Sequence, residues 1–299
     1  MASIPFIILD SLVYASWLFM VASGLTLIYG VMKVLNIAHG SLYAFGAYAN
    51  AWLIGWFFTN FSGFDYLAFL FIPLSAITVG IILSLFIEKI FLRKIYFRDE
   101  IVIVLVTYGL FLIFEDTMKL IFGTSSYLPY QPRMMLGNID ILTIPYVVYD
   151  LAIIFIALLI WLLFYLTMKY TKLGKLLLSV INDREMSSAL GINVNKVFIY
   201  TFTIGCLLGC LGGAISAPMI SVVPGIGVEV IVLTFAVVVT GGLGSVSGAA
   251  IGALFIGFAR TTAIFYAPQL ELFIVFFVMA IILSFKPEGL FGSKEIRKI

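Results

Sequence analysis

Between residues 197 and 259 the chain carries a single charged side chain, that of Glu229. A water-soluble domain has about 25% charged residues, and no soluble fold of ordinary size tolerates so long an uncharged stretch. The whole chain agrees, because 63% of its 299 residues are hydrophobic and 11% are charged. We therefore expect a protein whose surroundings are largely membrane lipid. The formal net charge of +2 is too balanced to suggest a nucleic-acid partner.

Long apolar segments predict the architecture. Crossing a hydrocarbon core of about 30 Å takes about 20 helical residues. Segments of this kind are expected at residues 4–30, 39–59, 66–88, 100–121, 146–168, 197–217, 249–266 and 270–285. A further apolar stretch, 228–241, reaches about 21 Å as a helix, so it is expected to be a half-helix or to have its ends buried by neighbours. The predicted fold is all-α and polytopic, with eight to nine membrane segments in a single transmembrane domain, residues 1–299.

The basic residues predict the orientation, because loops rich in Lys and Arg stay in the cytoplasm. The basic clusters are Lys89, Arg93, Lys94 and Arg98; Lys169, Lys172, Lys175, Arg184 and Lys196; and Lys294, Arg297 and Lys298. Counting crossings from these clusters places the N-terminus outside and, if 228–241 crosses, the C-terminus in the cytoplasm. No basic residue precedes the first apolar run, so 4–30 is expected to be a retained membrane segment and not a signal peptide.

The loop 169–196 is expected to be a cytoplasmic coupling loop. Its middle, roughly 175–190, has helical periodicity, with an apolar stripe opposite polar residues, and Gly191 fits a helix C-terminus. A cytosolic amphipathic helix between two membrane segments lies on the bilayer or inserts into a partner protein. A simple surface helix is the alternative.

Polar residues within the apolar segments are candidates for a translocation pathway, since such groups are costly in lipid unless protein or water surrounds them. Asn36, His39 and Ser41 lie together between two apolar runs. One interpretation is that they line the passage, or support its wall, near the cytoplasmic opening. The alternative is that backbone carbonyls at the start of a helix provide the hydrogen bonds of His39. Glu229 follows several helix-breaking residues, which is typical of a broken helix that faces the route.

A second charged group, Glu115, Asp116 and Lys119, lies inside a long segment near its expected outer end. Lys119 lies four positions after Glu115 and three after Asp116, so an ion pair on one helix face is expected. The alternative is contact with an external binding protein.

Small residues recur every four positions in three predicted helices, a spacing that lets helix backbones approach closely in a bilayer. They are Gly205, Gly209 and Gly213; Gly244, Gly248 and Gly252; and Ala47, Ala51 and Gly55. We interpret them as intramolecular packing sites, with a homodimer seam as the alternative. Cys206 and Cys210 are interpreted as small packing residues, so no cofactor, metal site or disulfide is expected.

Four blocks of the sequence resemble the branched-chain amino-acid ABC permeases of the Liv type. The first is GLTLIYGVMKVLNIAHGSLYAFGAY at 24–48. GGLGSVSGAAIGALFIG (241–257) and KPEGLFG (286–292) resemble the family's later blocks. The loop NDREMSSALGINVNKV is similar to the family's EAA-like coupling segment, with matches at Asn182, Ala189, Gly191 and Ile192. Together the blocks run in the family's order from about residue 17 to 292.

The resemblance implies a prokaryotic plasma or inner membrane protein that imports branched-chain or related aliphatic amino acids. It implies several partners: a second permease subunit in a heterodimer, two ATP-binding subunits and an extracytoplasmic solute-binding protein. Membrane lipid is expected to surround the permease. The residues expected to couple to the ATPase are Asn182, Asp183, Arg184, Glu185, Ala189 and Gly191. One departure is that Gly174 is followed by Lys175-Leu176, where the family usually has Arg-Ala.

Other classes of function remain as alternatives. Urea or short-amide ABC permeases carry very similar motifs. An ion-coupled secondary transporter would need ionisable residues near the bilayer midplane, where these segments have almost none. An intramembrane serine hydrolase would need His39 beside Ser245 or Ser247. The chain has no GxxxxGK[ST] motif, so it is not expected to hydrolyse ATP by a P-loop. Separate ATPase subunits are what the family resemblance implies, and no catalytic residue is expected.

Overall fold

The computed structural model of the protein describes residues 3–61, 63–96, 98–141 and 144–292. The basic residues Lys294, Arg297 and Lys298, on which the predicted position of the C-terminus depends, lie outside these ranges.

Long helices make up most of the described chain. They are α1 (Ser3–Met32), α2 (His39–Asn60), α3 (Ala68–Ile87), α5 (Glu100–Phe122), α7 (Val148–Tyr170), α10 (Val194–Ser216), α11 (Ile226–Gly241), α12 (Val246–Tyr266) and α13 (Glu271–Phe285). Within the described ranges, 7 helices are long and apolar enough to cross a membrane. α2 has 22 residues but is less apolar, and α11 has 16. Helices satisfy their own backbone groups, which lipid requires, and the predicted all-α, polytopic fold is confirmed.

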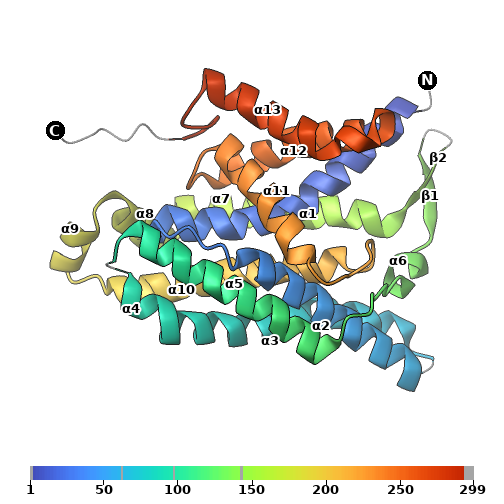
Figure 1. Cartoon of the computed structure of the whole chain (residues 1–299), viewed down its shortest axis with the longest axis horizontal. Helices are drawn as coiled ribbons and strands as arrows, with labels where there is room; N and C mark the ends of the chain where they lie inside the picture. The colour runs from blue at the N-terminus through green and yellow to red at the C-terminus, as the bar shows by residue number, and fades with distance from the viewer. Residues whose placement is uncertain (1–2, 62, 97, 142–143, 293–299) are drawn as a thin grey trace.

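Short elements lie at the two ends of the bundle (Figure 1). They are α4 (Arg93–Ile95), α6 (Gln131–Met135), β1 (Asn138–Ile141), β2 (Ile144–Val147), α8 (Lys172–Asn182) and α9 (Arg184–Ala189), with single helical turns at Asp65–Leu67, Glu88–Leu92 and Pro268–Leu270. α4, α8 and α9 occupy one end, which we call the α9 end. α6 and the antiparallel hairpin of β1 and β2 occupy the other, the hairpin end, where the N-terminus also lies. The sequence pattern did not predict this hairpin.

α1 and α10 form the centre of the bundle. α1 packs against α7, α10, α11 and α12, and α10 packs against α2 and α3 as well. α13 lies at the periphery, where Phe273, Phe277 and Phe285 are exposed. Apolar side chains on such an outer face suit contact with lipid.

α2 begins inside the bundle and not at its surface. α1 ends at Met32, and Lys33 then adopts a left-handed conformation with φ 55°. The chain passes α5, where the Ile37 N–H donates to Thr107 Oγ1 at 3.3 Å. The next helix starts at His39, which is fully buried. The predicted first and second segments are therefore joined by a non-helical connection that is largely buried after the exposed Lys33.

The predicted single helix at 175–190 is wrong in one respect, because two helices occupy this region. The backbone is extended at Asp183, with φ −154° and ψ 105°. Its carboxylate accepts a hydrogen bond from the Met186 N–H at 2.9 Å, which caps α9. Short polar side chains such as Asn and Asp compete with helical hydrogen bonds and favour caps. The Asn182-Asp183 pair therefore breaks the helix that the apolar periodicity alone predicts.

Candidate translocation cavity and coupling surface

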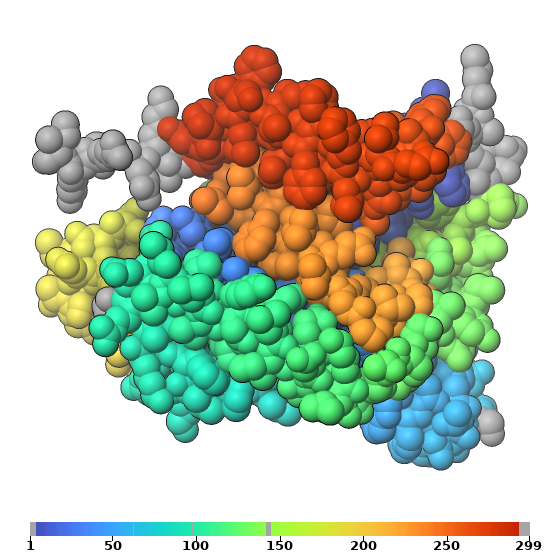
Figure 2. Space-filling view, in the orientation of Figure 1, coloured from blue at the N-terminus to red at the C-terminus, as the bar shows by residue number. Residues whose placement is uncertain are grey.

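A cavity of about 360 Å³ lies between the first half of α1, the start of α11 and the second half of α12. This volume falls within the range of small-molecule sites, roughly 300–1,000 Å³. The polar side chains in its lining are Asp10, Tyr14, Tyr43, Ser221, Glu229, Arg260 and Thr261. Figure 2 shows a hollow in this region, in which blue atoms of α1 lie between the orange C-terminal helices and the green hairpin end.

Arg260 is the cation of this cavity. Its guanidinium pairs with Glu229 at 3.3 Å and with Glu271, and it lies 4.3 Å above the centre of the Tyr14 ring. The Arg260 side chain is 17% exposed, whereas that of Glu229 is 54% exposed. A largely buried guanidinium held by two carboxylates and an aromatic face keeps a fixed position. The cavity thus has a fixed guanidinium paired with two carboxylates, of which that of Glu229 is accessible.

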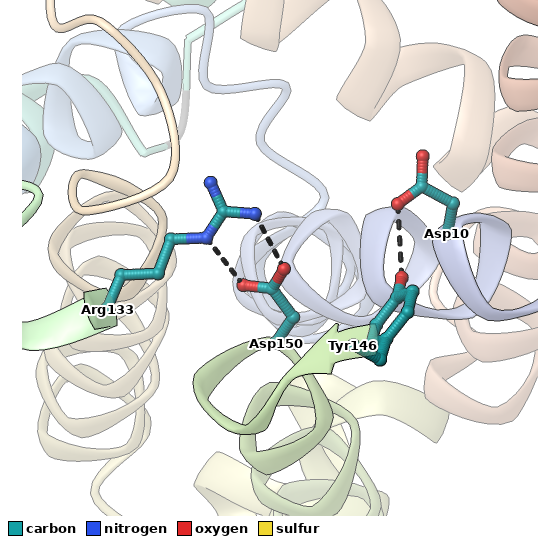
Figure 3. Close-up of polar contacts among 4 residues, drawn as sticks. All are labelled: Asp10, Arg133, Tyr146 and Asp150. Carbon is teal, nitrogen blue, oxygen red and sulfur yellow. Dashed lines mark hydrogen bonds and ion pairs between the residues drawn. The ribbon is translucent and has the colours of Figure 1, made fainter. Parts of the chain in front are cut away.

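Asp10 lines the cavity from α1 and is linked to the hairpin. Tyr146 in β2 donates its hydroxyl hydrogen to Asp10 Oδ1 at 3.1 Å, and the second Asp10 oxygen points away from Tyr146 (Figure 3). Burial, and then the nearby carboxylate, raises the pKa of the Tyr146 phenol, so at neutral pH Tyr146 is the donor. Among the described residues, Asp10 forms no ion pair within 4 Å.

A bidentate ion pair joins the two helices, α6 and α7, that flank the hairpin in the chain. Arg133 in α6 donates from Nε and Nη2 to the two carboxylate oxygens of Asp150 in α7, at 3.0 and 2.7 Å (Figure 3). The Asp150 side chain is 6% exposed and that of Arg133 is 33% exposed. Paired parallel hydrogen bonds of this kind are strong and directional. They fix α6, and the hairpin that follows it, to the start of α7.

The other residues expected along the pathway do not line this cavity. His39 is fully buried, and its Nε2 lies 3.0 Å from the Val21 carbonyl oxygen. Added Cβ atoms at Gly24 and Gly209 would each lie 3.1 Å from the imidazole. The ring therefore fills a space between α1 and α10 that glycines leave open. This placement is the arrangement expected of a histidine satisfied by a backbone carbonyl.

Asn36 and Ser41 are also fully buried. The Asn36 amide and the Ser41 hydroxyl have no hydrogen-bond partner within the described residues. Buried polar groups are normally satisfied by protein or water. In this conformation the two residues lie in packed interior beside the start of α2, and a role along the pathway remains a proposal.

The starts of α2 and α11 meet inside the bundle. An added Cβ at Gly227 would lie 3.0 Å from the Gly40 carbonyl oxygen and 2.8 Å from Glu115 Oε1. Glu115 is 8% exposed, so its carboxylate lies buried at the N-terminal end of α11. A negative charge there is favourable because helix N-termini carry partial positive charge. Lys119 instead pairs with Asp116 at 3.0 Å, so the expected pair forms with one acid of the two.

The glycines predicted to serve in packing face neighbouring elements. Added Cβ atoms at Gly205, Gly209, Gly213, Gly244, Gly248 and Gly252 would meet Ile28, His39, Tyr43, Gly30, Gly241 and Val237 respectively. Two details differ from the prediction. Gly244 lies in the turn before α12, with φ 85°, and Gly55 faces open space. Tight packing therefore involves only some of the small residues that recur every four positions in the sequence.

The predicted coupling residues lie at the α9 end. Asn182, Glu185, Ala189 and Gly191 are exposed, and Gly191 lies just after the end of α9 with φ 86°. Arg184 instead turns toward the bundle, where it donates to the Met32 carbonyl at 3.3 Å and lies 4.7 Å above the Phe198 ring. In α8, Val180 is buried and Leu177 packs against the core. Part of the apolar stripe thus faces the membrane helices, whereas Leu176, Met186 and Leu190 are exposed together with the polar groups of this end.

Several residues of this site were not singled out from the sequence: Asp10, Arg133, Tyr146, Asp150 and Arg260. A signal existed for three of them. Asp10, Asp150 and Arg260 lie inside predicted membrane segments, where an ionisable residue indicates a functional site by default. Nothing in the sequence joins Tyr146 to Asp10 or Arg133 to Asp150, because those contacts arise from folding. Within the described residues, no group of three or more His, Cys, Asp or Glu could hold a metal ion.

A polytopic helical bundle with a charged cavity at one end and the short helices α8 and α9 at the other is an architecture typical of a membrane transport protein. Residues 7–283 match the family described as the branched-chain amino acid transport system permease component, and the chain belongs to this family. The chain is therefore a permease subunit of an ABC importer and not an enzyme.

The matching relatives share low identity over nearly their full length. The high-affinity branched-chain amino acid transport system permease protein LivH of Escherichia coli is 24% identical over 295 residues, covering 94% of this chain and 92% of LivH. The permease protein BraD of Pseudomonas aeruginosa is 25% identical, covering 98% and 97%. A probable LivH of Methanocaldococcus jannaschii is 27% identical, covering 86% and 80%.

Proposed function

We propose that this permease imports branched-chain or related aliphatic amino acids across a prokaryotic plasma or inner membrane. The observation that carries the proposal is the family match over residues 7–283, with relatives that are named for branched-chain amino acid transport. The cavity supports it as well, since aliphatic side chains such as Ile7, Val13 and Val230 line the wall beside its charged groups.

We propose a heterodimer with a second permease subunit, energised by two separate ATP-binding subunits and fed by an extracytoplasmic solute-binding protein. The hairpin end faces outside and the α9 end faces the cytoplasm, as the basic clusters at 89–98 and 169–196 favour. The exposed residues of α8 and α9 form the surface that docks the ATPase, and lipid surrounds the peripheral helices. Substrate selection then lies largely in the binding protein.

The mechanism is alternating access. Closure of the ATP-bound subunits moves α9, and Arg184 transmits that movement through its contacts with the end of α1 and with α10. The buried connection before His39 and the short helix α11 are where the bundle can rearrange, because neither has the full length of a spanning helix. Nucleotide shifts the equilibrium only if it binds one state of the permease better than the other.

The test is uptake by the complete transporter in proteoliposomes, with the binding protein outside and ATP inside. The substrates are radiolabelled leucine, isoleucine and valine, compared with urea and acetamide. ATP-dependent uptake of the three amino acids supports the proposal. Uptake of urea or acetamide alone would contradict the substrate, and amino-acid uptake without any ATPase subunit would contradict the mechanism.

A further inference from the structure

The cavity between α1, α11 and α12 is lined by charged groups from different helices. On one side Asp10 presents a carboxylate oxygen that has no cationic partner within 4 Å among the described residues. On another side Arg260 presents a guanidinium held in place by Glu229, Glu271 and the face of Tyr14. An isolated carboxylate in a partly apolar site is costly, so this arrangement favours a bound cation near Asp10.

The remaining lining matches the rest of an aliphatic amino acid. Ile7, Val13, Trp17, Val230 and Ile264 give the cavity an apolar wall. Tyr14 lines the cavity, and its buried hydroxyl has no hydrogen-bond partner within the described residues, so a ligand that reaches it finds an unused donor. Small-molecule sites combine such mostly apolar walls with a few fixed polar groups.

We propose that this cavity is a relay site for a zwitterionic α-amino acid inside the permease, which rests on the proposed function. Asp10 binds the ammonium group, Arg260 with the Tyr14 hydroxyl binds the carboxylate, and the apolar wall accepts the aliphatic side chain. Tyr146 positions Asp10 by its hydrogen bond from the hairpin. The site lies at the hairpin end, where a solute released by an external binding protein would arrive first.

The critical variant is Asp10→Asn in the complete transporter. Asparagine keeps the size and can still accept the Tyr146 hydrogen bond, but it removes the charge that attracts the ammonium. Asp116→Asn is the matched control, because it removes one acid near the same end from the exposed pair with Lys119. Arg260→Lys keeps the positive charge for Glu229 and Glu271 and removes the planar fork.

Three measurements are made on each protein. Saturation-transfer NMR on the purified complex without its binding protein measures direct binding of L-leucine, of 4-methylpentanoate, which lacks the ammonium, and of 3-methylbutylamine, which lacks the carboxylate. Uptake of leucine at saturating loaded binding protein measures transport, and ATP hydrolysis in the same vesicles reports assembly and coupling.

We expect Asp10→Asn to weaken leucine binding and to lower maximal uptake roughly tenfold, with ATP hydrolysis within about twofold of the unmodified protein. Arg260→Lys should weaken 4-methylpentanoate binding and leave 3-methylbutylamine binding unchanged, and Asp116→Asn should leave direct leucine binding unchanged. Unchanged leucine binding and uptake in Asp10→Asn, in a transporter that imports leucine, overturns the relay site alone. If the unmodified transporter imports no amino acid, the proposed function itself fails.

Discussion

Single glycines decide how closely the central helices of this protein approach. Gly209 leaves room for the His39 ring, and Gly213 lies against the Tyr43 carbonyl oxygen, so no side chain fits there without backbone movement. Gly55 has the same four-residue spacing as its neighbours but faces open space. In lipid, where burial of apolar area gives helices little reason to associate, such close contacts supply much of the attraction. Their importance therefore depends on what each glycine faces.

Gly213→Ala is expected to destabilise the protein, because its Cβ would collide with the backbone of α2. Overpacking of this kind typically costs about 1–3 kcal/mol. Gly55→Ala, the same change at an open position in a helix, should be neutral or slightly stabilising, because Ala favours a helix more than Gly. Thermal unfolding of both variants in detergent, followed by size-exclusion chromatography, measures the difference. Equal stability of the two variants would show that α2 and α10 are not in contact at Gly213.

The ion pair of Arg133 with Asp150 is a second feature at the residue scale. Asp150 is almost fully buried, so removal of Arg133 leaves a buried charge without its partner. Breaking a buried pair from one side costs about 3–5 kcal/mol, whereas replacing both partners costs much less. The pair therefore fixes the position of the hairpin more than it adds to net stability.

Arg133→Ala should lower the unfolding temperature and expose the hairpin to protease, and Arg133→Ala with Asp150→Ala should recover part of the loss. A thermodynamic cycle of the two single variants and the double variant measures the coupling. Additive effects of the two changes would mean that the pair does not form in the membrane.

At the scale of elements, two helices do not behave as simple spanning helices. α2 starts beside Gly227 of α11, so two helix N-termini meet inside the bundle with the Glu115 carboxylate next to them. α8 packs its apolar stripe on the bundle while α9 projects beyond it (Figure 1). The break at Asp183 separates these two roles. It allows one short segment to be anchored in the membrane domain and the next to present polar groups.

Glu185→Lys should reduce ATP-driven uptake about tenfold or more, because a reversed charge at a docking surface opposes the partner's complementary charge. Glu185 is exposed, so the fold should be unaffected. Lys94→Glu, a charge reversal in α4 at the same end, is the control. Uptake and thermal stability are measured for both. Normal uptake by Glu185→Lys would remove α9 from the coupling surface.

For the whole molecule, the arrangement of the ends makes orientation testable. α9 and the hairpin lie at opposite ends (Figure 1), so one must face the cytoplasm if the bundle spans the bilayer. Cys206 and Cys210 are fully buried, which gives a low background for thiol labelling.

Asp140→Cys, in the hairpin, should react with a membrane-impermeant maleimide in intact cells. Glu185→Cys, in α9, should react only after the membrane is permeabilised. The fraction of labelled protein measures both. The reverse pattern would place the hairpin in the cytoplasm and would contradict the orientation predicted from the basic clusters.

The sequence by itself determined the helical, polytopic fold, the approximate ends of each apolar segment and the shortness of α11. These properties follow from local composition. Lipid permits few backbone structures, and the length of an apolar segment shows whether it can cross the hydrocarbon core. The sequence also located the polar projection at α9, although not the break at Asp183, where a side-chain cap outweighs apolar periodicity.

Only the tertiary structure decided which ionisable residues share a site. Asp10 and Arg260 are separated by most of the chain, yet both line one cavity with Tyr14. His39 and Glu115, which stand out in the sequence, are instead buried among glycines at helix ends. The physical reason is that a pattern records the spacing of residues along a helix. Which faces of different helices meet depends on how closely the backbones pack.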